Sequence, residues 1–109
     1  VRFGHTDPAR IAYYPRYFEW FHDAMEDFFE SAFGMSYADV LDTHAVGYPA
    51  VQVACEWRGP ARFGELCQME VFLSRLTERS ATFEYRLKRE GRLLATATVK
   101  TVIMYLILL

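Results

Sequence analysis

The stretch Val1–Phe33, VRFGHTDPARIAYYPRYFEWFHDAMEDFFESAF, decides the fold because it contains a tight turn followed by one long amphipathic helix. Asp7 and Pro8 form a turn, since proline fixes φ and an aspartate side chain bonds nearby backbone amides. Pro15 disfavours helix at the residue before it but is favoured in a first helical turn. We therefore expect the helix to begin at about Pro15 and to end at Gly34.

Acidic and apolar side chains fall on opposite faces of this helix, with a period close to 3.6. The acidic face carries Glu19, Asp23, Glu26, Asp27 and Glu30. The apolar face carries Phe18, Phe21, Met25, Phe28, Phe29 and Ala32. A helix of about 18 residues spans roughly 27 Å, which is enough to cross a small sheet. One helix can therefore form the main helical layer of the fold.

The rest of the chain mostly alternates apolar and polar residues, which predicts strands. The expected strands are Val1–Gly4 (the end of a first strand), Pro49–Trp57, Cys67–Leu76, Ala81–Lys88 and Leu93 to about Tyr105. Ser36–Leu41 is expected to form a short helix capped by Ser36, and the run 90–92, EGR, is a hairpin signal. One long helix among antiparallel strands predicts an α+β fold, with the helix packed on a curved antiparallel sheet.

The chain has 109 residues, of which 52% are hydrophobic and 17% aromatic. This length predicts a single domain, residues 1–109, because it leaves no room for a second core. So much apolar material in so short a chain indicates that part of it is covered by another subunit. The chain begins within an apparent strand and stops on leucines, so we expect residues to be missing at one or both ends.

Charge and composition argue against several classes of partner. The net charge is −2 and the charges are interspersed, so neither nucleic acid nor an anionic membrane is an expected partner. The apolar run Val102–Leu109 is far shorter than the roughly 20 residues of a membrane span and is interpreted as a strand. Cys55 and Cys67 lack metal-site spacing and fit buried thiols of a cytoplasmic protein. The three separated histidines predict no metal site, and no cofactor motif occurs.

Asp7 is the candidate for chemistry, because it lies between a strand end and the start of a helix. One interpretation is a structural turn aspartate that caps local amides. The other is an accessible carboxylate next to the free N–H groups and partial positive charge of a helix N-terminus. A carboxylate beside such donors is the minimal equipment for acyl transfer, since one group attacks or activates water and the other holds the oxyanion.

Two motifs resemble one family. Residues 3–24, FGHTDPARIAYYPRYFEWFHDA, resemble the N-terminal signature of the 4-hydroxybenzoyl-CoA thioesterase family of hot-dog enzymes, which is close to F-x-D-T-D-P-A-G-I-V-Y-Y-P-x-Y-x-x-W. Residues 60–66, PARFGEL, resemble that family's P-A-R-Y-G-D-x-L. With strand order and helix position, the resemblance covers nearly the whole chain. It implies a hot-dog fold, a homodimer or homotetramer joined edge to edge, and hydrolysis of an acyl-CoA to free acid and CoA without metal or cofactor.

The resemblance also implies roles for single residues. Asp7 is the catalytic carboxylate, acting as nucleophile on the thioester carbonyl or as base for water, and the Tyr14 N–H polarises that carbonyl. Tyr13 beside it is a candidate substrate contact. Arg10 replaces a glycine of the family motif. If this position needs positive φ, the arginine costs on the order of 1–2 kcal/mol; otherwise the loop has moved. The Arg10 side chain is expected either to reach the CoA phosphates or to pair with Asp7. His5 replaces an aspartate and is either an exposed turn residue or a partner of Asp7 or substrate.

Six further residues have two interpretations each. His22 is either a core histidine or a contact that reads the far end of the acyl group. Arg58 and Arg62 are either solvated loop residues or contacts to the CoA phosphates. The same two interpretations apply to the hairpin residues Lys88, Arg89 and Arg92.

Two other functions remain open from the residues alone. A hot-dog hydratase or dehydratase needs a differently placed histidine with an acid. A non-catalytic hot-dog module binds acyl-CoA, acyl carrier protein or a partner protein, and the departures at His5 and Arg10 keep this alternative open. The residues also do not distinguish an aromatic acyl group from a short or medium aliphatic one.

Overall fold

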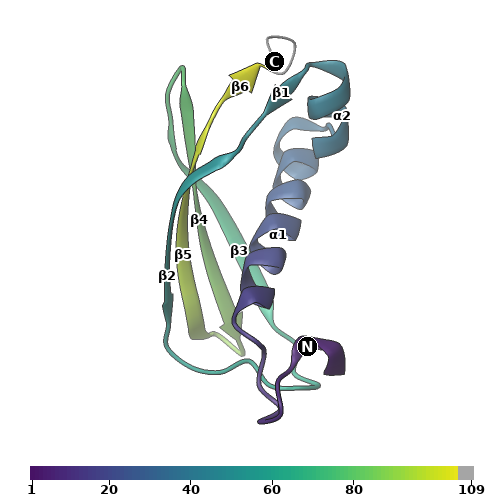
Figure 1. Cartoon of the computed structure of the whole chain (residues 1–109), viewed down its shortest axis with the longest axis vertical. Helices are drawn as coiled ribbons and strands as arrows, with labels where there is room; N and C mark the ends of the chain where they lie inside the picture. Colours follow the sequence, from purple (N-terminus) through teal and green to yellow (C-terminus); the bar gives the residue numbers. More distant parts are fainter. Residues whose placement is uncertain (106–109) are drawn as a thin grey trace.

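A computed structural model describes residues 1–105 of the chain. The helix α1 (Pro15–Phe33) lies across one face of a curved, four-stranded antiparallel sheet (Figure 1). The strands of this sheet, in spatial order, are β2 (Ala50–Trp57), β5 (Arg92–Val102), β4 (Ser80–Arg89) and β3 (Gln68–Leu76). A small second sheet pairs β1 (Val46–Gly47) with β6 (Met104–Tyr105). The predicted α+β hot-dog architecture is confirmed. No helix within residues 1–105 is long and apolar enough to cross a membrane.

Local signals set the ends of the helices as expected. Pro15 is the first residue of α1, and Gly34 ends it with φ +66°, a conformation that carries no Cβ penalty in glycine. The Gly34 N–H donates to the Glu30 carbonyl at 3.0 Å. Ser36 caps the short helix α2 (Tyr37–Thr43), with its Oγ accepting from the Asp39 N–H at 3.2 Å. The predicted Ser36 cap is confirmed, and α2 ends two residues later than expected.

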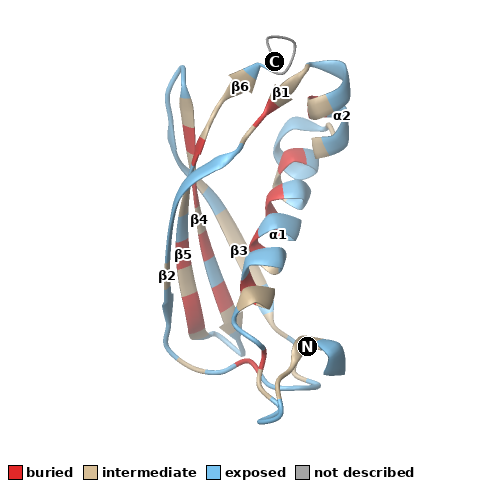
Figure 2. Ribbon diagram, viewed as in Figure 1, coloured by how far each residue is buried: buried red, intermediate tan, exposed pale blue. Residues whose placement is uncertain are grey.

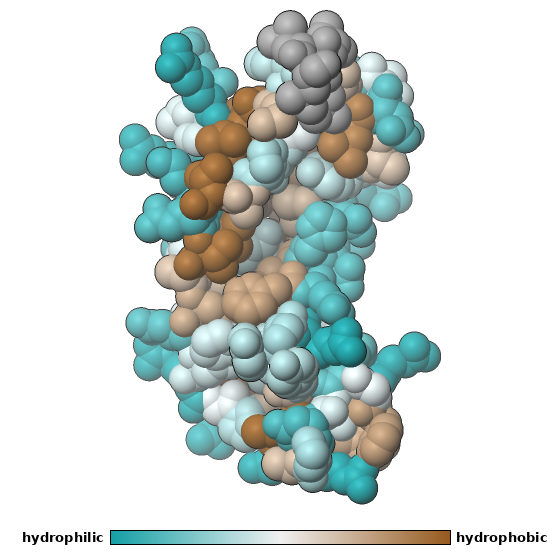
Figure 3. Space-filling view, in the orientation of Figure 1, coloured by the Kyte–Doolittle hydropathy of each residue, from teal (hydrophilic) through white to brown (hydrophobic). Residues whose placement is uncertain are grey.

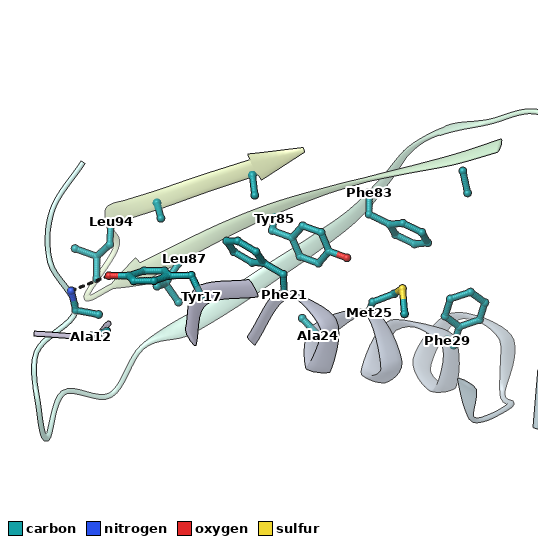
Figure 4. Packing of buried hydrophobic residues seen from close by; sticks show 14 of the residues in the cluster. Ala12, Tyr17, Phe21, Ala24, Met25, Phe29, Phe83, Tyr85, Leu87 and Leu94 are labelled. Atoms are coloured by element: carbon teal, nitrogen blue, oxygen red, sulfur yellow. Dashed lines mark hydrogen bonds between the residues drawn. The ribbon is translucent and has the colours of Figure 1, made fainter. Parts of the chain in front are cut away.

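The core lies between α1 and strand β4 (Figures 2 and 4). From α1 it takes Tyr17, Phe21, Ala24, Met25 and Phe29, and from β4 it takes Ala81, Phe83, Tyr85 and Leu87. Phe21 packs on Tyr85 with ring centroids 5.0 Å apart. The predicted apolar face was therefore partly wrong, because Tyr17 is buried while Phe18 is 37% exposed. The helix is rotated so that the Tyr17 hydroxyl reaches a loop amide, which sequence periodicity does not reveal.

Two predicted strands differ from the structure. Val1–Gly4 is not a strand end, because Phe3–His5 form a short 3-10 helix in which the His5 N–H donates to the Arg2 carbonyl at 3.0 Å. The last strand is interrupted at Ile103, whose N–H donates to the Arg79 carbonyl at 2.8 Å instead of continuing the ladder. The predicted strand over 102–109 extends beyond the residues that the structure describes.

Strand β2 forms one edge of the large sheet and is exposed along almost its whole length (Figure 2). Its side chains are nevertheless mostly apolar: Val51 is 57% exposed, Val53 47% and Trp57 44%. Hydrophobic residues gather over this strand in the view of Figure 3. A long, exposed, apolar edge strand is a template for pairing with another chain, and natural proteins rarely leave one uncovered.

Candidate active site

The Asp7 carboxylate is held in a tight turn with one oxygen left over. The Asp7 N–H donates to the Ile11 carbonyl at 3.0 Å, and the Arg10 N–H donates to the Asp7 carbonyl at 2.9 Å. The Ala9 N–H donates to Asp7 Oδ1 at 2.8 Å, which fixes the half-buried side chain. Asp7 Oδ2 accepts no hydrogen bond in the described part of the chain. The turn therefore orients the carboxylate and leaves one oxygen available to a ligand.

The start of α1 provides one free backbone donor, the Tyr14 N–H. Pro15 has no N–H, and the amides of Arg16 and Tyr17 are already bonded to the carbonyls of Tyr13 (2.9 Å) and Tyr14 (3.2 Å). The Tyr14 N–H donates no hydrogen bond to any residue from 1 to 105. Because it lies at the partially positive end of the helix, it suits an oxyanion.

A buried loop residue, Ala61, links the Asp7 turn to α1. Its carbonyl accepts from the Ala12 N–H at 2.7 Å. Its own N–H donates to the Tyr17 hydroxyl at 3.3 Å, the bond drawn as a dashed line at Tyr17 in Figure 4. Burial raises the pKa of the Tyr17 phenol, so this hydroxyl stays neutral. The Phe63 N–H also donates to the Arg10 carbonyl at 3.0 Å. The two sequence motifs are therefore in contact, and the second holds the first in place.

Arg10 does occupy a left-handed conformation, with φ +66°. For a non-glycine residue this costs about 1–2 kcal/mol. The Arg10 guanidinium lies 4.8 Å from the centre of the Phe3 ring, and an exposed cation–π contact returns about 0.5–1 kcal/mol. Within the described residues Arg10 forms no ion pair with Asp7. The arginine is thus tolerated at the position where the motif that this sequence resembles has glycine.

We expect Arg10→Gly to change the free energy of unfolding by less than about 1 kcal/mol, because relief of the left-handed strain offsets lost cation–π contact and added chain entropy. Arg10→Val loses the contact and increases the strain, because a β-branched side chain tolerates positive φ less well than arginine does, so we expect about 2 kcal/mol of destabilisation. Urea denaturation of both variants measures the difference. Equal losses in the two variants would show that the guanidinium contact, not the backbone, governs this position.

His5 and the tyrosines surround the turn without bonding the carboxylate. His5 Nδ1 accepts from the Arg2 N–H at 3.0 Å, and its ring meets the Trp20 ring edge-on at 5.3 Å. Tyr13 and Tyr14 are exposed and pack on each other at 5.4 Å. The Tyr14 ring also packs on Trp57 at 6.4 Å, so an aromatic surface joins the helix start to the end of β2. Trp57 was not among the predicted site residues, although it ends an alternating strand.

A groove of about 450 Å³ opens between α1, α2 and β2. Its lining is mostly apolar and includes five phenylalanine and tyrosine side chains: Phe18, Phe21, Tyr37, Tyr48 and Tyr85. His22 lies at this groove and is exposed, with Nε2 3.4 Å from Glu26 Oε1, so its interpretation as a core histidine was wrong. Burial raises the pKa of the Tyr37 and Tyr48 phenols, which keeps them neutral donors. Neither Asp7 nor Tyr14 lines this groove.

Arg58 and Arg62 lie outside this groove. The Arg58 N–H donates to the Leu94 carbonyl at 2.7 Å, and its guanidinium is 3.6 Å from a Glu56 carboxylate oxygen. Arg62 lies opposite Ile11 in an isolated β-bridge. The fold therefore brings Arg62 next to the Asp7 turn, from which it is separated by about fifty residues of sequence.

The fold and the turn define a class of protein, the thioester-processing hot-dog domains, and comparison with known proteins identifies the family. Residues 1–107 match the profile of the thioesterase-like superfamily, and the chain belongs to it. The chain is 28% identical to a 1,4-dihydroxy-2-naphthoyl-CoA hydrolase of Prochlorococcus marinus (strain MIT 9313), over 92% of this chain and 70% of that protein.

Two solved structures are also similar. One is the BH1999 gentisyl-coenzyme A thioesterase, with TM-score 0.88 and 28% identity over 96% of this chain and 84% of that one. The other is a hypothetical protein, TT1821 from Thermus thermophilus, with TM-score 0.91 and 33% identity over 96% of this chain and 80% of that one. Together these matches confirm the predicted family and the predicted hydrolysis of acyl-CoA thioesters.

Proposed function

We propose that this chain hydrolyses aromatic acyl-CoA thioesters at an active site formed between two copies of a single hot-dog domain. One observation carries the proposal. The available Asp7 oxygen and the free Tyr14 N–H lie at the start of α1, whereas the aromatic groove lies beside the middle of α1 and does not include them. A complete site for a thioester needs both parts.

Pairing of β2 with a second copy joins the two parts. In an antiparallel pair related by a two-fold axis, the Ala50 end of one strand lies beside the partner subunit's Trp57. Ala50 lines the groove, and Trp57 packs on Tyr14. The groove of one subunit therefore comes to the helix start of the other. The exposed apolar edge supports this assembly. A dimer is the smallest assembly that contains this β2–β2 pairing, and a tetramer made of two such dimers contains it twice.

The groove supports an aromatic acyl group. Its rings offer flat, apolar surfaces for stacking, and His22 with the neutral Tyr37 and Tyr48 phenols offers donors and acceptors for substituents on the acyl ring. Two of the similar proteins described above, a dihydroxynaphthoyl-CoA hydrolase and a gentisyl-CoA thioesterase, act on aromatic acyl groups by their names. A hydroxylated aromatic acid is therefore our proposed product.

The proposed chemistry needs only groups of this chain. The Tyr14 N–H donates to the thioester carbonyl oxygen and stabilises the negative charge that develops there. The Asp7 carboxylate either attacks the carbonyl carbon, forming an anhydride that water hydrolyses, or takes a proton from the attacking water. In both cases the C–S bond breaks, and the CoA thiolate leaves and is protonated. Sequence and geometry support both routes equally.

We also propose a cytoplasmic setting. Cys55 and Cys67 are free and half-buried, and burial raises the pKa of both thiols. Protonated thiols react slowly with oxidants, and cysteines that form no disulfide are typical of proteins in reducing compartments.

A thiol-release assay over a series of acyl-CoA substrates tests the substrate class. We expect the kcat/KM for benzoyl-, hydroxybenzoyl- and dihydroxynaphthoyl-CoA to exceed that for hexanoyl- and octanoyl-CoA at least about tenfold, because flexible chains forgo stacking in the groove. His22→Leu is expected to narrow the preference for hydroxylated over plain rings. Faster release from the straight-chain substrates contradicts the aromatic class, and no release from any thioester contradicts the proposed function.

A further inference from the structure

A buried phenol, that of Tyr85 on β4, lines the groove of about 450 Å³ without a hydrogen-bond partner. The residue is only 2% exposed, and its hydroxyl forms no hydrogen bond with residues 1–105. This oxygen is not among the polar atoms of the same residues that are sealed from solvent without a partner, so it opens to the groove. Buried hydroxyl groups nearly always have a partner, so this exception needs an explanation.

The packing around Tyr85 fixes the direction of its hydroxyl. The Phe21 ring lies against the Tyr85 ring, with 5.0 Å between the centroids and 34° between the planes. In Figure 4 the Tyr85 oxygen points away from the Phe21 ring, and no dashed line joins it to another residue. Burial raises the pKa of this phenol, so the hydroxyl stays neutral and keeps its hydrogen. Tyr85 therefore offers one O–H donor in a fixed position inside a mostly apolar groove.

The other polar side chains that line the groove differ from Tyr85. The Thr101 hydroxyl is also buried, but it already donates to a backbone carbonyl of β4 at 2.7 Å. His22 is exposed, and Tyr37 and Tyr48 are half-buried, so water can bond to all three. Among the side chains of the groove, Tyr85 is therefore the buried donor whose partner is left to a ligand.

Tyr85 lies deep in the groove, away from the β2 edge at which the second subunit is proposed to join. Val53 on β2 pairs with Val99 on β5, and Val99 pairs with Phe83 on β4, two residues before Tyr85. With about 4.8 Å between neighbouring strands, β4 lies roughly 10 Å from the edge strand. Val53 and Val99 both line the groove. An acyl group that enters over the β2 edge therefore passes two apolar side chains before its far end reaches Tyr85.

We infer that Tyr85 is a specificity-determining residue whose phenol O–H donates a hydrogen bond to a ring hydroxyl at the far end of an aromatic acyl group. The inference rests on the proposed function, because it assigns which part of the same substrate the groove recognises. A plain ring displaces water from the Tyr85 hydroxyl and leaves it unpaired, which lowers affinity about tenfold to a hundredfold. A ring hydroxyl restores the bond, so the residue selects the substituent by penalising its absence.

Tyr85→Phe tests this inference, because it removes only the hydroxyl and keeps the ring that packs on Phe21. For the wild type we expect kcat/KM for 4-hydroxybenzoyl-CoA to exceed that for benzoyl-CoA at least about tenfold. We expect Tyr85→Phe to reduce this ratio at least about fivefold, mainly through KM, because the hydroxylated ring loses its donor and the plain ring no longer leaves one unpaired. Tyr105→Phe, which removes an exposed phenol hydroxyl from β6, is the matched control and is expected to leave the ratio unchanged.

The melting temperature of Tyr85→Phe is a second readout. A hydroxyl without a partner in the protein adds nothing to the fold, so we expect this variant to melt at or above the wild-type temperature. A drop of several degrees shows that the hydroxyl bonds within the folded protein and overturns the inference. An unchanged substrate ratio in Tyr85→Phe, or the same fall in Tyr105→Phe, overturns it as well.

Binding of two CoA thioethers separates this inference from the proposed function. The probes, 4-hydroxyphenacyl-CoA and phenacyl-CoA, carry the same two rings on a C–S bond that water does not cleave. In calorimetric titrations we expect the wild type to bind the hydroxylated probe at least about tenfold more tightly, and Tyr85→Phe to reduce this difference at least about fivefold. That result without thiol release from any acyl-CoA contradicts the proposed hydrolysis and supports the role of Tyr85. Thiol release with an unchanged preference in Tyr85→Phe contradicts the role of Tyr85 alone.

Discussion

Asp7→Asn is expected to lower kcat for an aromatic acyl-CoA by about a thousandfold or more while leaving the protein folded. The asparagine side chain can still accept the Ala9 N–H, so the turn that precedes α1 is kept. What it loses is the negative charge, and with it the ability to attack the carbonyl or to take a proton from water. A thiol-release assay measures kcat, and thermal unfolding of the purified variant measures the stability of the fold.

The matched control for this variant is Asp27→Asn, which removes the same charge from the exposed side of α1 and is expected to keep full activity. Asp7→Asn with an unchanged melting temperature and near-wild-type turnover would show that Asp7 has only a structural role in the turn. A drop in activity accompanied by a large drop in melting temperature would assign the effect to the turn, and Asp7→Glu would then separate charge from geometry.

If the proposed β2–β2 dimer forms, Val53→Lys is expected to make the protein monomeric and to lower kcat/KM by about a hundredfold or more. Val53 is 47% exposed in the single chain, so a lysine there remains solvated and the fold is spared. In a β2–β2 pair the same ammonium group would be taken out of water at the interface, which is costly for an unpaired charge. Light scattering after size exclusion gives the mass, and a thiol-release assay gives the activity.

Leu76→Lys is the matched control, because Leu76 is also exposed and apolar but lies at the end of β3, the opposite edge strand. It is expected to keep both the dimer and the activity. Val53 also lines the groove, so a dimeric but inactive Val53→Lys would point to the groove alone. A dimeric and active variant would refute assembly through β2.

Mixed dimers test whether the site is shared between subunits. His22→Trp is expected to fill the groove of its own subunit, and Asp7→Asn to inactivate the catalytic turn of its own subunit. If each site combines the turn of one subunit with the groove of the other, co-refolding of the two inactive variants restores activity, because one site of each mixed dimer then carries neither change. A site contained within one subunit gives no restoration.

Much of the candidate site was accessible from residue spacing. The Asp7 turn and the helix start at Pro15 were predicted from local chemistry, since proline and aspartate act on their immediate neighbours. The grouping of Arg58, Arg62, Arg89 and Arg92 around one pocket was not predicted. Their two segments lie about thirty residues apart in the sequence and meet only when the β4–β5 hairpin packs beside the loop after β2. The same holds for Ala61, a small residue whose backbone carbonyl accepts from the Ala12 N–H and whose N–H donates to the Tyr17 hydroxyl.

The amino-acid sequence by itself determined the features that depend on neighbouring residues: the ends of α1 at Pro15 and Gly34, and the two-residue turn of the last hairpin, where Glu90 and Gly91 both have positive φ. The tertiary structure alone decided the rotation of α1, which buries Tyr17 and exposes Phe18. It also decided where the groove and the arginine pocket form. The reason is physical: backbone conformation responds to adjacent side chains, whereas burial and charge clustering depend on segments that meet only after folding.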